Sequence, residues 1–388
     1  MADHALLSAS GAKKWVTCPP SARLEETFPD ETSSAAAEGT KAHELVELMA
    51  REQFLDQPAP GHLLTPAGLA EAGFTHAMIE AAREFIVECK KIIDPLKASG
   101  KPYTVLIEQR LDYSPWVPEG FGTGDLVIVS GHCVWVRDFK YGKGVPVDSE
   151  ENYQMMLYGL GAHNELSFAY EDINEFDLGI VQPRIHNNSS WRITTKDLLA
   201  WGEMIKPIAQ LAWEGKGEFK PGPHCESSFC RARFTCKARA SACLAASAGL
   251  TSPDLMLAEE ITELLPELES IEKWAKGLRE YALKQAVDHG ARYEGFKLVE
   301  GRSNRFITDK KVAMVRLTAN GYPQPGFMTE PELVGVTALE ELIGSKKGFN
   351  ELLGDLVSKP PGKPALVPIS DKRPEWQPVG SADELFID

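Results

Sequence analysis

The stretch 124–140, GDLVIVSGHCVWVRDFK, contains two apolar runs separated by two residues, Gly131 and His132. Glycine at the first position of a two-residue turn favours type II′, which joins antiparallel strands into a hairpin. In the register that this turn sets, Asp125 lies directly opposite Asp138. Because both runs are apolar on both faces, the stretch predicts two central strands of a buried sheet.

The predicted pairing places two carboxylates at one end of the hairpin. Facing residues of antiparallel strands have Cβ atoms roughly 4.5–5.5 Å apart and point to the same face, where like charges destabilise the sheet. Lys140 shares that face because it lies two residues beyond Asp138. Mg²⁺ takes oxygen ligands, typically one or two carboxylates with water and phosphate. The pattern therefore indicates a divalent-metal site at Asp125 and Asp138; a solvated ion pair of Asp138 with Lys140 is the alternative.

Two predicted helices carry further polar residues. Residues 37–54 have apolar side chains at helical spacing and include His43 within GTKAH. Residues 150–165 form a second predicted helix, in which Gln154 and Tyr158 share a face because they are four residues apart. A lone helix histidine, or a polar pair beside an apolar stripe, is most simply a packing feature. The order of these groups along the chain, rather than any one residue, points to a site.

That order is GTxxH, an aspartate in a strand, D-x-K and Q-x-x-x-Y. It resembles the RecB-type branch of the PD-(D/E)XK nuclease superfamily, although each motif alone is weakly specific. The resemblance covers about residues 35–165 and implies an α/β fold with a mixed central sheet flanked by helices. Aspartate in place of the commoner glutamate before x-K is within the family's pattern.

The resemblance also implies roles for individual residues. Its implied ligands for Mg²⁺ or Mn²⁺ are His43, Asp125, Asp138 and the carbonyl of Phe139. Its implied catalytic residues are Asp125, Asp138, Lys140, Gln154, Tyr158 and Glu108, the last on the first core strand. In such proteins the metal ion activates a water and neutralises charge on the scissile phosphate. The lysine orients or polarises that water and phosphate, and the Gln/Tyr helix contacts substrate or braces the site.

The segments EGRSNRF (300–306), GKPALVPISDKRP (362–374) and the cysteine-containing HCESSFCRARFTCKARASAC (224–243) extend the comparison. With them the whole chain resembles a phage-encoded family of RecB-like nucleases. That resemblance implies a divalent-metal-dependent DNA exonuclease of phage recombination or DNA processing, located in the host cytoplasm. Its expected partners are DNA and a phage single-strand annealing or single-strand-binding protein. Two alternatives stay open: a noncatalytic DNA-binding scaffold that keeps the nuclease fold, and a zinc-clipped interaction module. The polarity of digestion, the strand preference and the oligomeric state are not indicated.

The seven cysteines include a cluster with the spacing Cys225-x₄-Cys230-x₅-Cys236, with Cys243 shortly after it and Cys18 far away near the start. The N-terminal residues lack the apolar core of a signal peptide, and no apolar stretch is long enough to span a membrane. We therefore expect a reducing cytoplasmic compartment and no membrane contact. In that compartment a tight cysteine cluster indicates metal more often than disulfides.

Some RecB-like nucleases carry an iron–sulfur cluster whose first cysteine precedes the nuclease core and whose other three follow it. The ligands that this layout implies here are Cys18, Cys225, Cys230 and Cys236. The usual spacing is C-x₂-C-x₅-C, so the longer first gap leaves open that Cys243 replaces one of them. Four thiolates suit a [4Fe–4S] cluster and equally a structural zinc ion. Either would clip the start of the chain to the end of the core.

The length of 388 residues predicts about two domains. We expect residues 1–250 to form the nuclease core with its metal clip, and residues 251–388 to form a mainly helical extension with a Pro-rich tail. A formal net charge of −15 argues against indiscriminate coating of DNA, because nonspecific affinity comes from neutralising phosphates with Lys and Arg. A nuclease then needs a locally basic channel, whose candidate residues are Lys140, Lys143, Arg184, Arg231, Arg233, Lys237 and Arg239.

The remaining predicted elements follow from hydrophobic periodicity and turn residues. The predicted strands are 103–111, 124–129, 133–140, 176–182 and 191–194, with a further strand pair around 296–306. The predicted helices, besides the two given above, are 67–99, 196–213, 253–289 and 309–320.

Overall fold

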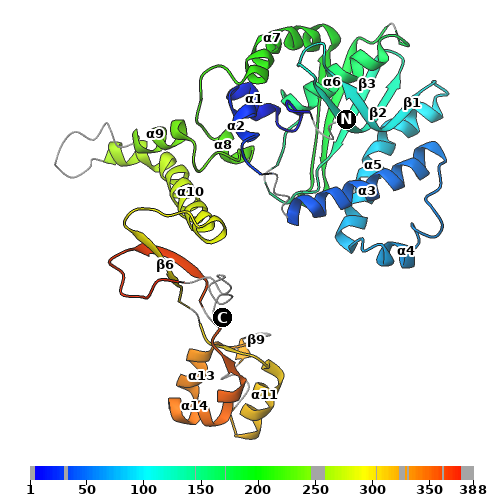
Figure 1. The fold of residues 1–388 in the computed structure, drawn as a ribbon. Helices are drawn as coiled ribbons and strands as arrows, with labels where there is room; N and C mark the ends of the chain where they lie inside the picture. Colours follow the sequence, from blue (N-terminus) through cyan, green and yellow to red (C-terminus); the bar gives the residue numbers. More distant parts are fainter. Residues whose placement is uncertain are drawn as a thin grey trace, which may run out of the picture. The chain divides into compact units, whose positions relative to one another are not determined.

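The computed structural model describes most of the chain and divides it into two compact units, Met1–Ile271 and Glu272–Asp388 (Figure 1). The described residues are 5–29, 34–144, 146–170, 172–245, 258–302, 304–322, 328–329, 332–360 and 362–376. The division falls within a long helix, α10 (Ala258–His289), beyond the predicted boundary after residue 250. No helix in these residues is long and apolar enough to cross a bilayer.

The first unit is built on one five-stranded sheet with the strand order β1-β2-β3-β4-β5. Its strands are β1 (Thr104–Asp112), β2 (Phe121–Ser130), β3 (Cys133–Phe139), β4 (Glu175–Gln182) and β5 (Asn187–Thr194). Neighbouring strands are antiparallel except β3 and β4, which are parallel. A parallel pair needs a crossover connection, and helix α6 (Tyr153–Leu166) lies in that connection. The mixed sheet with its helices confirms the predicted α/β class.

The β2–β3 hairpin has the register that the turn predicted. Its regular pairs run from Ser130 opposite Cys133 to Leu126 opposite Arg137. Gly131 has φ +56°, a conformation that glycine adopts without steric cost. The same register continued by one pair would place Asp125 opposite Asp138, but regular pairing stops before them. The change from regular pairing at this point coincides with the candidate site.

Helices cover the sheet through two separate hydrophobic clusters. The helices of the first unit are α1 (Ala12–Thr17), α2 (Ser21–Glu25), α3 (Ser34–Leu55), α4 (Pro66–Glu71), α5 (His76–Ala98), α6, α7 (Thr195–Glu214), α8 (His224–Ser227), α9 (Lys237–Ala245) and the short 3₁₀ helix η1 (Pro183–Ile185). One cluster joins alternate residues of β2, such as Val127, to α1, α6 and α7. The other joins Leu126 and Ile128 to α3 and α5. Alternation of this kind is what a strand buried on both faces produces.

The predicted single helix 67–99 is wrong, because the structure breaks it into α4 and α5. Gly73 has φ +72° between the two helices. The Thr75 hydroxyl then accepts a hydrogen bond from the N–H of Met78 and begins α5. A threonine whose hydroxyl satisfies a free N–H of the first turn is a strong start signal for a helix. Apolar spacing on both sides of this break concealed it. The predicted helices 37–54, 150–165 and 196–213 are confirmed as α3, α6 and α7.

The second unit has a small core of its own, formed mainly by helices that follow α10. Its elements are β6 (Phe296–Glu300), β7 (Phe306–Ile307), α11 (Lys310–Ala319), β8 (Met328–Thr329), β9 (Glu332–Leu333), α13 (Val336–Ile343), α14 (Lys346–Leu353), η2 (Gly354–Leu356), β10 (Val357–Ser358) and β11 (Pro364–Pro368). The predicted pairing of strands within 296–306 is wrong: β6 pairs with β11, and β7 pairs with β10. Part of the expected Pro-rich tail is thus a strand. Residues 253–257 of the predicted helix 253–289 lie outside the described residues.

Close packing of α6 on β1 leads to a stability prediction. A Cβ atom on Gly161 of α6 would lie 2.8 Å from Cβ of Leu111 and 3.0 Å from its backbone carbonyl carbon. We therefore expect Gly161→Ala to lower the free energy of unfolding by about 2 kcal/mol despite the better helix propensity of alanine. Gly39→Ala in α3 is the control, since nothing lies within 4 Å of its added Cβ, and we expect it to be neutral or stabilising by up to about 1 kcal/mol. Thermal unfolding measures both, and equal effects would contradict the close contact.

Candidate active site

Three acidic residues lie on adjacent strands where regular pairing is interrupted. Glu108 of β1 lies between the pairs Ile107–Leu126 and Gln109–Gly124, beside Asp125 of β2. Glu108 has φ +49°, which is rare for a residue other than glycine. A backbone held in this region costs about 1–3 kcal/mol and persists only where the surroundings impose it. Asp138 lies on the third strand, β3, one residue beyond the last regular pair.

The backbone at Glu108 reverses the faces of β1. Val105 and Ile107 belong to the cluster with α3 and α5, whereas Leu111 belongs to the cluster with α6. In a regular strand these three residues would share one face. Strand β2 reverses its faces at the same place. A Cβ on Gly124 would lie 2.8 Å from a methyl carbon of Leu111, on the α6 side of the sheet, whereas Leu126, two residues further on, faces α3 and α5. The reversal turns the Glu108 carboxylate toward Asp125.

His43 of α3 completes a group that can hold a metal ion. One ligand atom from each of His43, Glu108 and Asp125 lies within 4.8 Å of the other two. Nδ1 of His43 is 2.9 Å from Oδ1 of Asp125, and the N–H of Phe139 donates to Oδ2 of Asp125 at 2.6 Å. The Phe139 ring packs edge-on against the His43 ring, with centroids 5.2 Å apart. Helix α3, held in place by buried Leu45, thus positions His43 over the two carboxylates.

The other predicted residues form a hydrogen-bonded row beside this group. Oδ1 of Asp138 accepts from Nε2 of Gln154 at 2.9 Å, and the same nitrogen lies 3.1 Å from the Tyr158 hydroxyl. Nζ of Lys140 donates to Oε1 of Gln154 at 3.0 Å and lies 3.1 Å from Oδ2 of Asp138. Gln154 stands in the first turn of α6, where the side chain of Asn152 caps the helix. The amide of Gln154 therefore fixes both the acid and the lysine.

The structure divides the predicted residues differently from the sequence-based expectation. We expected the metal ligands to be Asp125 and Asp138, together with His43 and the Phe139 carbonyl. In the described residues the tight group instead consists of His43, Glu108 and Asp125, while Asp138 lies beside it with Lys140 and Gln154. Glu108 was expected as a catalytic acid, not as a ligand. Regular strand alternation does not reveal its orientation, because that depends on the single positive φ angle.

Burial and neighbouring charges shift the pKa values of three side chains in the site. Burial lowers the pKa of His43, but the charge and hydrogen bond of Asp125 outweigh the effect of burial and raise the pKa to about 9. Burial and the nearby Asp125 charge raise the pKa of Glu108 to about 7. Burial also raises the pKa of Asp138, aided by Asp125 and opposed by Lys140. Each acid thus resists carrying its charge unless a cation is near.

The residues present fit a hard divalent cation. The donor set is two or three carboxylates and one imidazole, which suits Mg²⁺ or Mn²⁺. Oδ2 of Asp138 is buried and accepts no hydrogen bond of ordinary geometry from the described residues, although Lys140 is near. The Lys140 ammonium, 3.1 Å away, offsets only part of the cost of burying this oxygen. A cation between the strands would offset both that cost and the mutual repulsion of the acids.

Mn²⁺ binding is expected to tighten by at least about tenfold between pH 6 and pH 8. The ion competes with protons on His43, whose pKa is about 9, and on Glu108, whose pKa is about 7. Titration calorimetry at the two pH values measures the change. Glu108→Gln is the control, because it removes one of the competing protons and should flatten the pH dependence. Equal affinity at both pH values would contradict the grouping of these residues.

The same shifts set the pH dependence of stability for the metal-free protein. The raised pKa of His43 gives stability that is complete below 6.5 and lost as the pH rises through about 9. The raised pKa of Glu108 gives stability that is complete below 4.5 and lost as the pH rises through about 7. Both shifts make the metal-free protein less stable as the pH rises. Removing the metal ion with EDTA should therefore lower the melting temperature more at pH 8 than at pH 6.

The fold and the site described so far define an α/β protein with a candidate divalent-metal site at the end of the β2–β3 hairpin. The chain is a member of the family described as "Protein of unknown function (DUF2800)", whose model matches residues 4–374 and so covers both units.

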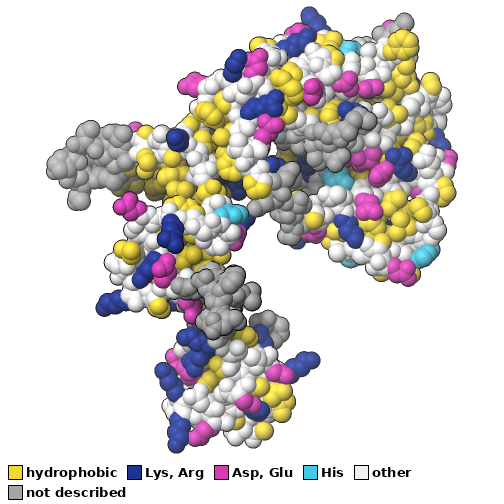
Figure 2. Space-filling model, in the orientation of Figure 1, with side chains coloured by type: hydrophobic (Ala, Val, Ile, Leu, Met, Phe, Trp, Pro, Cys, Tyr) yellow, Lys and Arg dark blue, Asp and Glu magenta, His cyan; other side chains and the backbone are white. Residues whose placement is uncertain are grey.

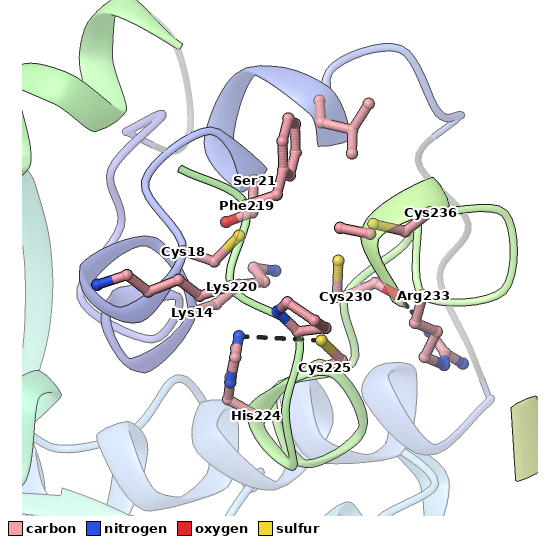
Figure 3. Close-up of a pocket in the computed structure, with 13 residues that line it drawn as sticks. Lys14, Cys18, Ser21, Phe219, Lys220, His224, Cys225, Cys230, Arg233 and Cys236 are labelled. Carbon is pink, nitrogen blue, oxygen red and sulfur yellow. Dashed lines mark hydrogen bonds between the residues drawn. The ribbon is translucent and has the colours of Figure 1, made fainter. Parts of the chain in front are cut away.

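A second site gathers four cysteines from distant parts of the chain. Its cysteines are Cys18, which follows α1, Cys225 of α8, and Cys230 and Cys236 between α8 and α9. They line one cavity, and their sulfur atoms point toward a common space (Figure 3). Burial raises the pKa of Cys18, with further contributions from Cys225 and Cys236. Burial and the charge of Glu25 raise the pKa of Cys230 to about 11. The predicted gathering of Cys18 with the later cluster is therefore seen.

Four thiolates bound to one zinc ion lie about 3.8 Å from each other, given Zn–S bonds of about 2.3 Å in a tetrahedron. Among the described residues, no three of the cysteine sulfurs lie within 4.8 Å of one another. The four cysteines therefore surround one cavity without adopting the spacing of zinc ligands, and both metal alternatives stay open. Cys243, on α9, does not line the cavity, so nothing here favours it as a substitute ligand.

The predicted basic residues also divide into two sets. Arg239 and Arg233 near the cysteines form ion pairs with Glu226, at 2.8 and 3.6 Å. By contrast Lys140, Lys143 and Arg184 line a groove together with His43 and Glu108. On the face drawn in Figure 2, acidic and basic side chains are interspersed over the first unit. Three of the predicted basic residues therefore lie in the groove that His43 and Glu108 line.

Proposed function

We propose that this chain is a divalent-metal-dependent DNA exonuclease that hydrolyses phosphodiester bonds. One observation carries the proposal: the ligand atoms of His43, Glu108 and Asp125 lie within 4.8 Å of one another, and His43 and Glu108 line a groove together with Lys140. A metal-binding group can activate a water for phosphodiester hydrolysis, and an ammonium beside it can stabilise the charge that develops on the phosphate. The resemblance of the motifs to RecB-type nucleases supports DNA as the substrate and an exonucleolytic reaction.

The residues would divide the chemistry as follows. His43, Glu108 and Asp125, with Asp138 beside them, would hold the ion, which would supply a water of lowered pKa and countercharge for the phosphate. Lys140 provides fixed positive charge for the phosphate oxygens, because its ammonium is held by Gln154 and Asp138. Tyr158 in turn limits the rotation of the Gln154 amide. Each contact keeps a charged group in place before substrate arrives, which reduces reorganisation during the reaction.

The biological setting of the proposal rests on the resemblance alone. It would be phage recombination or DNA processing in the host cytoplasm, with a single-strand annealing or single-strand-binding protein as the expected partner. Co-purification of the tagged chain with such a protein from infected cells would support that setting. Recovery of the chain without it would contradict it.

Digestion of linear, circular, single-stranded and double-stranded DNA in the presence of Mg²⁺ tests the activity. We expect degradation of linear DNA, sparing of closed circles, and no reaction in EDTA. Lys140→Met should lower the rate by about 100-fold or more while DNA binding changes little. Binding without hydrolysis by the wild type would support a DNA-binding scaffold instead. Duplexes blocked at the 5′ or 3′ end would then give the polarity.

We also propose that Cys18, Cys225, Cys230 and Cys236 hold a [4Fe–4S] cluster. Four cysteine thiolates are the usual ligands of this cluster, the four cysteines line one cavity, and the order of one cysteine before the sheet and three after it resembles that of RecB-like nucleases with such a cluster. Anaerobic purification followed by iron, sulfide and zinc analysis tests the assignment, together with the broad visible absorbance band of the cluster. Stoichiometric zinc without iron would overturn it.

A further inference from the structure

The groove beside the metal group contains a second set of residues that the hydrolysis scheme does not use. Glu38, Tyr141, Lys143 and Arg184 line it together with His43, Glu108 and Lys140. They come from the first turns of α3, the segment after β3, and η1. Two of them, Arg184 and Tyr141, carry hydrogen-bonding groups that the described residues leave largely unused.

Arg184 is held in place without a close acceptor. Pro183 begins the short helix η1 and fixes the backbone where the chain leaves β4. The guanidinium carbon lies 4.3 Å from the centre of the Tyr141 ring, a cation–π contact that orients the group. Its nearest carboxylate oxygen, Oε1 of Glu38, is 3.6 Å away, longer than an ordinary hydrogen bond. The side chain is only 15% exposed, so its orientation is restricted while its N–H donors keep capacity for a ligand.

Tyr141 supplies an independent observation. The residue is 5% exposed, and its buried hydroxyl has no hydrogen-bond partner among the residues that the structure describes. A buried hydroxyl is usually paired, because leaving it unpaired costs stability. Tyr141 also lines the groove. Because its hydroxyl is closed off from solvent, a ligand seated against Arg184 reaches it only with a small shift of the side chains around it.

We propose that Arg184 and the Tyr141 hydroxyl form a binding subsite for a second phosphate group of the DNA strand, next to the one that is hydrolysed. The identity of the ligand as DNA rests on the proposed function. Guanidinium and hydroxyl donors match the oxygens of a phosphate, and a planar guanidinium does so through two parallel hydrogen bonds. Lys143 is exposed in the same groove and adds positive charge. Glu38, 44% exposed, competes weakly for Arg184 and would move aside.

The subsite positions the strand rather than taking part in bond breaking. A phosphate held at Arg184 would fix the register of the backbone relative to the metal group. Two sources supply the same chemistry: an internal phosphodiester and the phosphate at a strand end. The choice between them decides whether the enzyme measures position along a strand or recognises its terminus.

Equilibrium binding of a short fluorescent DNA duplex in EDTA tests the subsite without any hydrolysis. We expect Arg184→Gln to weaken binding by about tenfold or more, the usual effect of losing a charged hydrogen-bonding partner. Tyr141→Phe should weaken it several-fold while the melting temperature stays equal or rises, because the variant removes only the unpaired hydroxyl. Glu38→Gln should tighten binding, since it removes the competitor of Arg184. Arg83→Gln, on α5 and outside the groove, is the charge-matched control and should change little.

Duplexes that carry a 5′-phosphate or a 5′-hydroxyl separate the two sources. If the wild type prefers the 5′-phosphate and Arg184→Gln loses that preference, the subsite binds the strand terminus. Equal weakening for both duplexes assigns it to an internal phosphate. Inorganic phosphate should compete with DNA in the wild type and not in Arg184→Gln.

Wild-type affinity in both Arg184→Gln and Tyr141→Phe would overturn the subsite, and so would weaker binding on Glu38→Gln, which would indicate a structural ion pair. The absence of measurable DNA binding by the wild type would overturn it as well. Failure of the nuclease proposal looks different: the wild type would not degrade DNA with Mg²⁺ or Mn²⁺, while the binding differences among these variants would persist.

Discussion

Asp125→Asn is expected to abolish Mg²⁺-dependent hydrolysis of linear DNA, lowering the rate by at least about 1,000-fold. Asp125 belongs to the candidate metal group and is held on both carboxylate oxygens, by His43 at Oδ1 and by the Phe139 N–H at Oδ2. Losing its charge removes several kcal/mol of favourable interaction with a divalent ion, and each 1.36 kcal/mol is about tenfold in rate. Quantifying acid-soluble nucleotides released from linear duplex DNA measures the loss.

The asparagine side chain keeps the size of aspartate and can still accept the Phe139 N–H. The variant should therefore fold, which thermal unfolding in EDTA checks. The matched control is Asp94→Asn on the exposed face of α5. Asp94 belongs neither to the candidate metal group nor to the lining of the groove, so this variant should retain wild-type activity. If Asp125→Asn folded normally and degraded DNA at the wild-type rate, the hydrolytic role of the site would be disproved.

The second large effect is expected for Cys230→Ser, which should lower stability and solubility far more than it alters the hydrolytic step. The proposed ligand Cys18 lies far along the first unit from the other three, Cys225, Cys230 and Cys236. A metal bound by them would close a very long loop of chain, and cross-links over long loops restrict the unfolded state most. We expect a loss of about 4 kcal/mol, which corresponds to a fall of roughly 10 °C in melting temperature for a unit of this size. Differential scanning calorimetry and iron analysis measure the two consequences together.

Cys243→Ser is the matched control for that change. Cys243 lies on α9 and is not among the residues that line the cavity, so its replacement should leave the iron content and melting temperature as they are. A Cys230→Ser variant with full thermal stability and full metal content would show that no clip exists at these cysteines. The reverse result for Cys243→Ser would make it a ligand.

Several parts of the fold could be predicted because their signals are local. The two-residue turn at Gly131 set the hairpin register, and its apolar flanks indicated central strands. Helices such as α6 follow from the spacing of apolar residues and from a capping side chain, here Asn152. Each of these signals lies within about ten residues of the structure it specifies, so no long-range contact is needed to read it.

Other parts could not be predicted, for an equally physical reason. The pairing of β6 with β11 joins segments more than sixty positions apart, and short strands have too little pattern to show their partner. The break between α4 and α5 lies in a stretch whose apolar spacing continues across it. The pairing of Arg184 with Tyr141 brings together residues on neighbouring strands' ends, and neither belongs to a recognisable motif.

The sequence by itself determined which side chains are candidates for chemistry: the two aspartates at one end of the hairpin, the lysine directly after its second strand and the scattered cysteines can be recognised from residue type and spacing. Only the tertiary structure decided which of these side chains lie together. A left-handed backbone at Glu108 turns that acid toward His43 and Asp125, while Gln154 holds Asp138 with Lys140. A single φ angle in a strand leaves no periodic trace in the sequence, because packing on both faces of the sheet imposes it.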